Sequence, residues 1–340
     1  MFIGFNLRLD KNADIFYEEY DYENLQKWGK KHLDAQKASY EKDLEEYVKQ
    51  NEIDGTKIQN EWFPEIDADI FISHSHNDEE LACALAGWIN HKFGLNCFID
   101  SNVWGYSAKL IDEMNNKLSN KSENSGENLY DYQSCNQVSQ HVNTMLSIAL
   151  QKMIDKVETV IFLNTDNSVR VYKDTEMEKT YSPWIYSEIT CTQIVRKKPL
   201  LAYRNYSNIK KGGFAVYESA QFVMHSAISY TVSLKHLKTL SEGDLYDWNI
   251  EYSNNRKNYE YALDALYKSV CPDEVNNTRD LFSQLRSREI EALQKVYSNQ
   301  NMDSEEQREV QFILKNIMDR YLRNCLECEG CRYVRNDRYQ

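Results

Sequence analysis

Asp69-Ile-Phe-Ile-Ser-His-Ser75 is the segment that most clearly indicates the fold class of this chain. Ile70 to Ile72 form a short apolar run with β-branched and aromatic side chains, which is typical of a parallel strand buried on both faces. Polar groups then follow from Ser73 to Asp78. Open α/β sheets bind their ligands at the carboxyl ends of their strands. The stretch therefore predicts the first strand of an α/β domain with a ligand site at its end.

Four later segments resemble buried strands, and helical spacing separates them. The predicted strands are residues 95–99, 158–163, 199–203 and 227–232, and the predicted helices are residues 78–93, 108–118, 142–154, 183–195 and 234–240. Strands that alternate with helices at this spacing favour a parallel sheet covered on both faces. We therefore predict a flavodoxin-like α/β fold.

The flanking regions carry helical rather than strand patterns. Apolar residues at helical intervals predict a long amphipathic helix over residues 22–51, and residues 53–67 are interpreted as a linker. The helix either packs on the following domain, which we favour, or serves as an oligomerisation arm. The predicted organisation is an N-terminal helical extension and linker (1–66), the α/β domain (67–248, with an inserted loop at 119–136) and a C-terminal helical region (249–340).

Composition excludes several classes of partner. The 340 residues carry a formal net charge of -13, whereas nucleic acids and anionic membrane surfaces are bound by a basic face. The sequence has no apolar run long enough to span a membrane and no signal-peptide pattern at its start, so we expect a cytoplasmic protein. Its eight cysteines are expected to be thiols. Neither a G-x-G-x-x-G turn nor a G-x-x-x-x-G-K-[ST] loop is present, so a nucleotide would need another cradle.

Three segments in order resemble a Toll/interleukin-1 receptor (TIR) domain. They are the opening strand 69–75 with its acidic helix, the strand 98–100 before a Trp- and Gly-containing loop, and Ser-Pro-Trp-Ile-Tyr-Ser-Glu-Ile at 182–189. The resemblance implies a five-stranded parallel sheet. It also implies one of two functions, which are scaffold assembly through TIR contacts or cleavage of NAD⁺ at the nicotinamide-ribose bond.

The enzymatic alternative depends on Glu188. The resemblance makes Glu188 the catalytic carboxylate, with Trp184 beside it as a wall of the substrate site. One carboxylate is sufficient for this chemistry because nicotinamide leaves as a neutral molecule and needs no proton from a general acid, unlike the leaving oxygen of ordinary glycosides. Glu188 would stabilise the oxocarbenium charge as it develops. Trp184 is equally suited to a core position.

The remaining candidate residues lie in loops at the ends of the first two predicted strands. Ser73, His74 and Ser75 either contact a phosphate or ribose of the substrate or cap the next helix. Asp100 and Trp104 either contact the substrate or have structural roles, such as ending the strand or shielding the loop. The sequence departs from the common family pattern at His74, at the loop after Asp100, at Ile185 and at the inserted loop 119–136.

The resemblance is closer to bacterial TIR proteins, including the TIR component of Thoeris anti-phage systems, than to animal receptors. It implies an NAD⁺ nucleosidase or ADP-ribosyl cyclase that uses NAD⁺ as substrate and needs no cofactor. Its product would be an ADP-ribose-derived signal for a downstream effector, and TIR contacts would assemble a homo-oligomer. The alternatives are a non-enzymatic scaffold and an effector that depletes NAD⁺. No residue decides between hydrolysis and cyclisation.

Cys325, Cys328 and Cys331 form two overlapping C-x-x-C pairs near the C-terminus. Thiolates at this spacing suit zinc, but a structural zinc site needs four ligands and no second pair follows. We therefore favour a loosely packed thiol tail over a metal site.

Overall fold

The computed structural model describes residues 1–36, 48–49, 52–100, 107–118, 131–172, 177–198, 200–203, 228–259, 261–274, 292 and 305–313. Its contacts divide the chain into two compact units, of which the first comprises residues 1–197 and 209–265. This unit contains a five-stranded sheet whose strands are all parallel. The predicted α/β class and the five-stranded parallel sheet are confirmed.

The sheet has the strand order β10-β1-β6-β4-β5. The strands span Ile3–Leu7 (β1), Ile70–Ser73 (β4), Cys97–Phe98 (β5), Thr159–Leu163 (β6) and Lys238–Leu240 (β10). Every residue of β4 and β6 is buried, as expected for parallel strands covered on both faces. In register, Ile70 faces Thr159 and Leu7 faces both Leu163 and Leu240.

Strand β1 was missed because Gly4 and Asn6 interrupt its apolar residues. The sequence interpretation placed residues 1–66 outside the sheet, but β1 pairs with β6 on one side and with β10 on the other. A Cβ at Gly4 would lie 2.6 Å from Leu237 Cδ2, so the residue type follows from close packing. The N-terminal segment is therefore part of the sheet.

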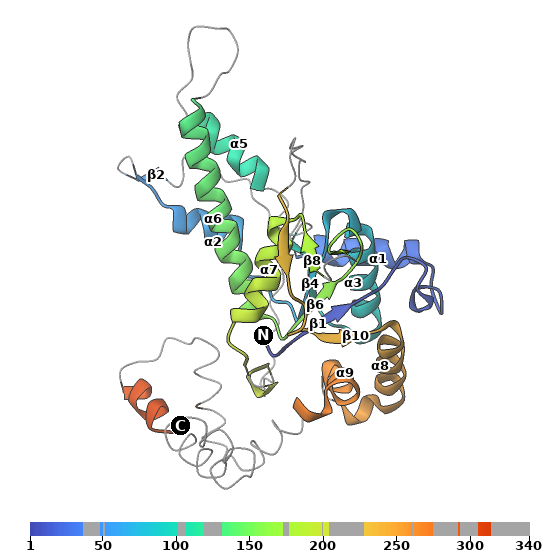
Figure 1. Ribbon diagram of the computed structural model, residues 1–340. Helices are drawn as coiled ribbons and strands as arrows, with labels where there is room; N and C mark the ends of the chain where they lie inside the picture. Colours follow the sequence, from blue (N-terminus) through green and yellow to red (C-terminus); the bar gives the residue numbers. More distant parts are fainter. Residues whose placement is uncertain are drawn as a thin grey trace, which may run out of the picture. The chain divides into compact units, whose positions relative to one another are not determined.

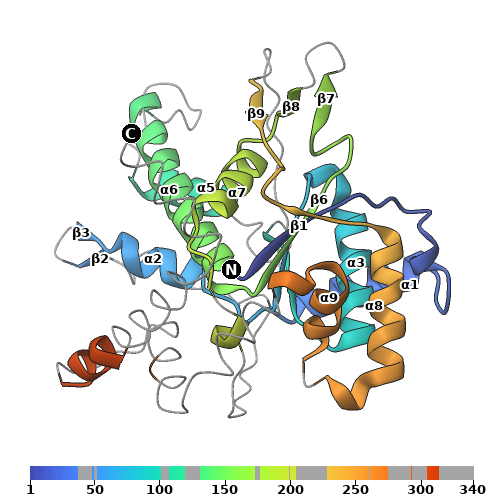
Figure 2. The same cartoon turned by 60° about the horizontal axis from the view of Figure 1, so that its bottom comes forward.

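Helices cover both faces of the sheet (Figures 1 and 2). One face carries α1 (Tyr22–Asp34), α3 (Glu79–Phe93) and α8 (Glu242–Asn255). The other face carries α2 (Gly55–Trp62), α6 (Tyr132–Lys156) and α7 (Pro183–Ile194), with α5 (Ser107–Leu118) packed on α6. The predicted helix after Asp78 is confirmed, and it ends at Gly94, which has a φ of 69°.

Two glycines let α1 and α3 pack backbone against backbone. A Cβ at Gly29 would lie 1.8 Å from the carbonyl oxygen of Cys83, and one at Gly87 would lie 2.0 Å from that of Leu25. No real side chain tolerates such a contact without movement of the backbone. Glycine lowers the helical propensity of α1, but at position 29 it is required for the close packing of α1 on α3.

The first 66 residues contain two further departures from prediction. The long helix over residues 22–51 is wrong, because α1 ends at Asp34 and residues Val48–Lys49 (β2) pair antiparallel with Glu52–Ile53 (β3). The segment interpreted as a linker contains α2, whose Ile58 and Trp62 are buried in the core. Asp54 caps this helix by accepting a hydrogen bond from the Lys57 amide at 2.9 Å.

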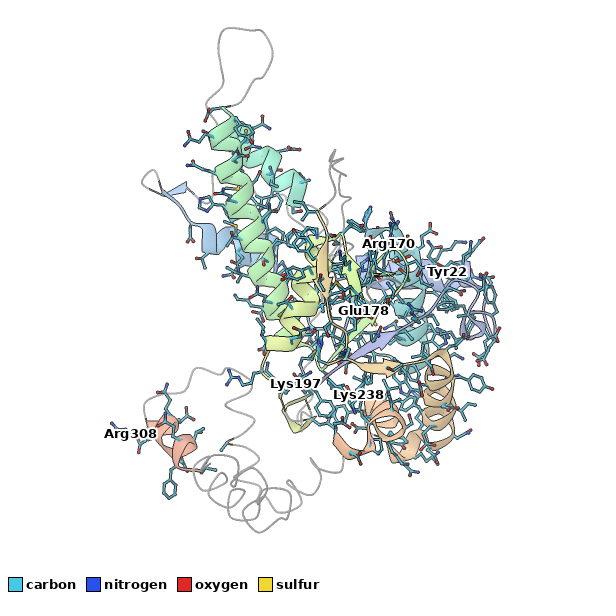
Figure 3. All side chains as sticks on the ribbon, in the orientation of Figure 1. Tyr22, Arg170, Glu178, Lys197, Lys238 and Arg308 are labelled. Atoms are coloured by element: carbon cyan, nitrogen blue, oxygen red, sulfur yellow. The ribbon has the colours of Figure 1, made fainter. Side chains whose placement is uncertain are left out.

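A small antiparallel sheet accounts for part of the region after β6. It comprises Arg170–Tyr172 (β7), Met177–Thr180 (β8) and Tyr230–Val232 (β9) in that order. The predicted strand 227–232 thus forms over residues 230–232, outside the main sheet. Figure 3 labels Arg170 and Glu178 on this small sheet and Tyr22 at the start of α1. The predicted inserted loop 119–136 overlaps α6, which begins at Tyr132.

Two predictions beyond α7 are wrong. Leu200–Tyr203 forms a 3-10 helix (η4) instead of a strand. Residues 234–240 contain strand β10, although the three-residue spacing of Leu234, Leu237 and Leu240 favoured a helix. The sheet positions beside β6 are filled by β1 and then β10, so the strand order differs from the 2-1-3-4-5 order of flavodoxin-like folds.

The remaining described elements are helical. They are two further 3-10 turns before α1 and α3, Asp14–Phe16 (η1) and His76–Asp78 (η3), then Arg256–Asn258 (η5), Ala262–Val270 (α9) and a helical segment at 305–313. The second unit comprises residues 198–208 and 266–340. Among the described residues, no helix combines the length and the apolar character that a membrane span requires.

Candidate functional site

Helix α7 positions Glu188 on its buried face. Ser182 caps the helix by accepting a hydrogen bond from the Ile185 amide at 3.2 Å, and Pro183 occupies the first turn, where its missing N–H is not needed. The buried positions recur at helical spacing and are Ile185, Glu188, Ile189, Cys191 and Thr192. A carboxyl group is thus held among apolar neighbours, with 2% of the residue exposed.

Glu188 meets the carboxyl end of β4. The Ser73 hydroxyl donates a hydrogen bond to Glu188 Oε2, and both residues are buried. Burial raises the pKa of Glu188 well above its ordinary value, and the nearby negative charge of Asp100 raises that pKa further, while the bond from Ser73 lowers it. The structure therefore brings together three of the predicted site residues, which are Ser73, Asp100 and Glu188.

His74 belongs to the same cluster. Burial lowers its pKa because the imidazolium loses solvation, and the charges of Asp100, Glu79 and Asp78 oppose that effect. Asp100 therefore acts on both Glu188 and His74. The cluster contains an acid whose neutral form is favoured and a histidine whose neutral form is favoured.

For the other candidate residues, the structure shows no hydrogen bond to the carboxyl group of Glu188 among the described residues. Trp184 is half-buried and packs against the hydrophobic core that includes Phe71, Phe98 and Leu150. The side chain of Ser75 makes no capping hydrogen bond to the 3-10 turn that follows it. Trp104 and the three cysteines of the C-terminal tail, Cys325, Cys328 and Cys331, lie outside the described residues.

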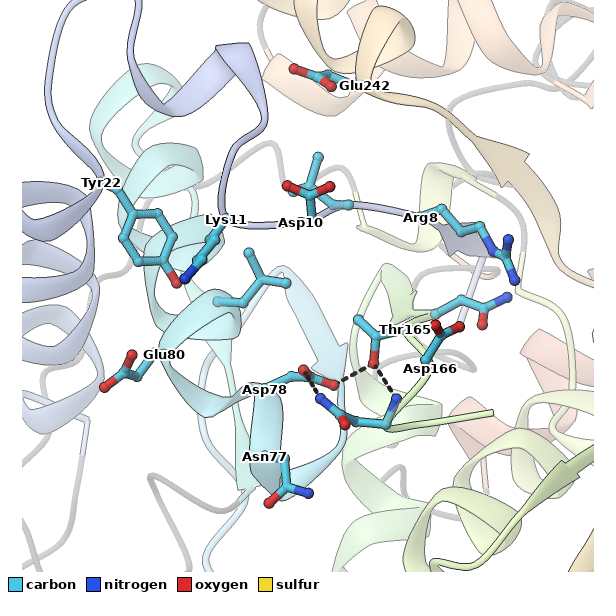
Figure 4. Close-up of a pocket in the computed structure, with 14 residues that line it drawn as sticks. Arg8, Asp10, Lys11, Tyr22, Asn77, Asp78, Glu80, Thr165, Asp166 and Glu242 are labelled. Carbon is cyan, nitrogen blue, oxygen red and sulfur yellow. Dashed lines mark hydrogen bonds between the residues drawn. The ribbon is translucent and has the colours of Figure 1, made fainter. Parts of the chain in front are cut away.

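A polar pocket of about 560 Å³ lies at the same edge of the sheet (Figure 4). Its lining comes from the segments that follow β1, β4, β6 and β10, together with Tyr22 at the start of α1. The residues that line it are Arg8, Leu9, Asp10, Lys11, Tyr22, Asn77, Asp78, Glu80, Leu81, Asn164, Thr165, Asp166, Asn167 and Glu242. Asn77 and Asp78 belong to the polar stretch predicted after the first strand, whereas the described candidates Ser73, His74, Ser75, Asp100, Trp184 and Glu188 do not line the pocket.

Asp78 ties two strand ends together in this pocket. Its carboxylate accepts hydrogen bonds from Thr165 Oγ1 at 2.5 Å and from Asn167 Nδ2 at 2.7 Å, as the dashed lines in Figure 4 show. Both partners follow β6, whereas Asp78 follows β4. The sequence predicted a site at the polar residues after β4, but Thr165 and Asn167 follow a predicted strand without any motif that marks them as partners of Asp78.

The pocket and the Glu188 cluster lie towards opposite faces of the sheet. Strands β1, β4 and β10 lead into α1, α3 and α8 on one face, whereas α7, which follows β6, lies on the other. Strand β6 lies between β1 and β4, so the connections diverge on both sides of its carboxyl end. Such divergence opens the crevice in which open α/β sheets bind ligands.

Comparisons with known proteins give no family for this chain. No family model, no curated protein and no solved structure matches it. Within the described part of the chain, no group of three or more His, Cys, Asp or Glu side chains is arranged to hold a metal ion. The case for a function therefore depends on the geometry of the two sites.

Proposed function

We propose that this chain is a TIR-like NAD⁺ nucleosidase that cleaves the nicotinamide-ribose bond with Glu188 as its catalytic carboxylate. The observation that carries the proposal is the hydrogen bond from Ser73, at the end of β4, to the buried carboxyl group of Glu188 on α7. The order β5-β4-β6 supports it, because these strands follow the 2-1-3 part of the flavodoxin-like order. Strands β1 and β10 then occupy the fourth and fifth places.

The positive charge of the substrate explains how Glu188, a buried acid with a raised pKa, can become ionised for the reaction. Burial and Asp100 favour the protonated form of Glu188 in the free protein. The nicotinamide ring of NAD⁺ is positively charged, and a cation beside a carboxyl group favours its ionised form. Substrate binding would therefore release the proton of Glu188 to solvent. The resulting carboxylate faces the reacting ribose in a site with little solvent screening.

The bond changes need no second carboxylate. The C1′–N bond of the nicotinamide riboside breaks, and its electron pair goes to the nicotinamide nitrogen, which becomes neutral. The ribosyl group is left with oxocarbenium charge, which ionised Glu188 stabilises more strongly in the transition state than in the bound substrate. Water then adds at C1′ and loses a proton, giving ADP-ribose. An adenine nitrogen or a ribose hydroxyl adding instead gives a cyclic product without consuming water.

The test measures nicotinamide released from NAD⁺ by the purified protein and by Glu188→Gln. This substitution keeps the size of the side chain and removes its charge. We expect the rate to fall by about 10²–10³-fold, which is the usual effect of removing one group that stabilises transition-state charge. Glu23→Gln is the matched control, because Glu23 lies on the exposed surface of α1, 4.0 Å from Lys27.

Three readouts decide the outcome. Equal nicotinamide release by the wild type and Glu188→Gln rejects Glu188 as the catalytic residue. A loss of release accompanied by a loss of cooperative thermal unfolding would make Glu188 a folding residue. Mass spectrometry of the products separates the two enzymatic alternatives, since ADP-ribose alone indicates hydrolysis or NAD⁺ depletion and a cyclic isomer indicates a signal for a downstream effector.

The scaffold alternative has an observation of its own. The small antiparallel sheet exposes two large side chains on one face, because Tyr172 and Met177 are paired across β7 and β8 and are 38% and 46% exposed. Exposed apolar patches commonly mark protein contacts, so this sheet is a candidate surface for homo-oligomer assembly. A non-enzymatic scaffold predicts that Met177→Ser changes the mass of the assembly by light scattering while no nicotinamide is released at any protein concentration.

A further inference from the structure

We propose that the pocket at the ends of β1, β4 and β6 binds a polyhydroxylated, uncharged ligand through a vicinal diol, either as a free sugar or as the ribose of a nucleoside. This site is separate from the Glu188 cluster, and the proposal does not depend on NAD⁺ cleavage. It is argued from the pocket's position, its mixed donors and acceptors, and a buried amide.

The position of the pocket favours a ligand site. It has a volume of about 560 Å³, which is within the range of small-molecule sites. It also lies where the connections from β6 and its two neighbours diverge to opposite faces, which is the place where open α/β sheets form their ligand crevice. A floor fixed by Asp78, Thr165 and Asn167 means that the site is largely formed before a ligand arrives.

The charged side chains around the pocket disfavour three kinds of ligand, which are phosphates, polyamines and metal ions. Five carboxylates and two cationic side chains line it. The field in the pocket is negative because the carboxylates outnumber the cationic side chains. In agreement, burial and then the charges of Glu80 and Asp78 raise the pKa of Tyr22 to about 12. Such a field repels a phosphate, while Arg8 and Lys11 disfavour a polyamine. Metal ions are disfavoured in turn, because the carboxylates in the described part of the chain form no metal-binding group.

A hydroxyl group matches the lining because it both donates and accepts. Carboxylates of Asp10, Glu80 and Asp166 accept hydrogen bonds, while Arg8 and Lys11 donate them. In the view of Figure 4, Lys11 and Tyr22 lie towards one end of the pocket and Arg8 and Asp166 towards the other. Among the described residues, neither Arg8 nor Lys11 forms a salt bridge, so both remain available to a ligand.

Asn164 supplies a second, independent observation. It lines the pocket with 6% of its surface exposed, and its Oδ1 has no hydrogen-bond partner within the described part of the structure. A buried amide oxygen without a partner costs about 1–3 kcal/mol. A hydroxyl donor in the pocket, or a water molecule that it holds in place, would remove that cost. Acidic side chains at strand ends pair with ribose hydroxyls in other open α/β sheets.

Isothermal titration calorimetry with defined probes tests the proposal on the full chain. Adenosine represents the nucleoside source and methyl α-D-glucopyranoside the free sugar, and 2′-deoxyadenosine lacks the diol. We expect saturable binding of one or both diol probes with a Kd of about 1 mM or tighter. We also expect 2′-deoxyadenosine to bind at least ~10-fold more weakly than adenosine, since a site that hydrogen-bonds a hydroxyl discriminates against its absence.

Matched variants locate the binding. Glu80→Ala and Asp166→Ala change exposed side chains of the lining, and each should weaken binding by at least ~10-fold, which corresponds to one lost charged hydrogen bond. Glu23→Ala and Glu188→Gln should leave it unchanged. Because Glu188→Gln removes NAD⁺ cleavage but not diol binding, failure of either proposal is distinguishable from failure of the other.

Four results would overturn the proposal. They are the absence of saturable binding by both diol probes, saturable binding of adenosine that 2′-deoxyadenosine equals, binding of AMP or spermidine that is tighter than that of either diol probe, and loss of adenosine binding in Glu188→Gln but not in Glu80→Ala. Binding by adenosine alone would assign the nucleoside source, and binding by the glucoside alone would assign the free sugar.

Discussion

The Glu188 cluster and the polar pocket occupy the same edge of one sheet, yet they use carboxylates in opposite ways. Glu188 is buried on α7 and takes its hydrogen bond from a protein hydroxyl, so its neutral form is favoured. The acids around the pocket, such as Glu80 and Asp166, are mostly exposed. A buried acid suits charge that develops only during a reaction, whereas solvated acids suit the recognition of hydroxyl groups.

The pH dependence of stability should give the largest difference between the two regions. Burial raises the folded-state pKa of Glu188 above its ordinary value of 4.5, so the folded state binds more protons than the unfolded state. The contribution of Glu188 is therefore fully present below about pH 4.5 and is lost as pH rises through the folded-state value. Relative to Glu188→Gln, the wild type should lose ~1.4 kcal/mol of unfolding free energy per pH unit in that window.

Urea unfolding of both proteins at a series of pH values measures this effect. The comparison with Glu188→Gln is needed because neutral His74 has the opposite slope below pH 6.5, where its lowered pKa makes the folded state bind fewer protons. Glu80→Gln is the control from the pocket, because it removes the charge of an exposed carboxylate instead of a buried one. Parallel curves for Glu188→Gln and the wild type would show that Glu188 is not desolvated.

Gly87→Ala should damage the pocket side selectively. The added Cβ would lie 2.0 Å from the Leu25 carbonyl oxygen, so α1 and α3 must move apart. Overpacking of this kind lowers the free energy of unfolding by about 1–3 kcal/mol. We expect the upper end because the two nearest atoms, the Leu25 carbonyl oxygen and the Gly29 amide nitrogen, belong to the backbone. Since α1 supplies Tyr22 and α3 supplies Glu80, diol binding should weaken more than nicotinamide release. Equal loss of the two activities would indicate that the faces of the sheet do not behave independently.

Asp78→Asn should have a smaller effect on stability. The amide nitrogen would replace one of the two oxygens that accept from Thr165 and Asn167, leaving one donor facing another. We expect a loss of ~1.5 kcal/mol in urea unfolding. Asp166→Asn is the matched control from the same pocket, and as an exposed residue it should change stability by less than ~0.5 kcal/mol. An unchanged midpoint for Asp78→Asn would mean that the two hydrogen bonds contribute no net stability.

Gly94→Ala should have the smallest effect, because it affects the end of α3 that is remote from both sites. Gly94 has a φ of 69°, but no atom lies within 4 Å of an added Cβ. The cost is therefore the left-handed backbone alone, at ~1 kcal/mol by thermal unfolding, with diol binding and nicotinamide release both retained. A loss as large as that of Gly87→Ala would show that helix ends, and not the packing of α1 on α3, limit stability.

The features that depend on local pattern could be predicted from the amino-acid sequence. The apolar runs at Asp69–Ser75 and Glu158–Leu163 identified β4 and β6, because strands buried on both faces must be apolar throughout. The start of α7 at Pro183 was predicted as well, because the fixed φ of proline suits the first turn of a helix. The TIR resemblance assigned Ser73 and Glu188 to the same site, although it did not predict the hydrogen bond between them.

The tertiary structure alone decided which segments complete the sheet and where its second pocket lies. Strand β1 carries Gly4 and Asn6, and β10 is three residues long. Neither segment therefore has a periodic pattern clear enough to predict a strand in preference to a loop or a helix. Their identity as strands comes from pairing between residues more than 200 positions apart, such as Leu7 with Leu240. Pairing between distant segments produces no periodic pattern within either segment. Only the pairing of β1 with β6 in the structure therefore shows that Arg8 to Lys11 line a pocket at the carboxyl end of the sheet.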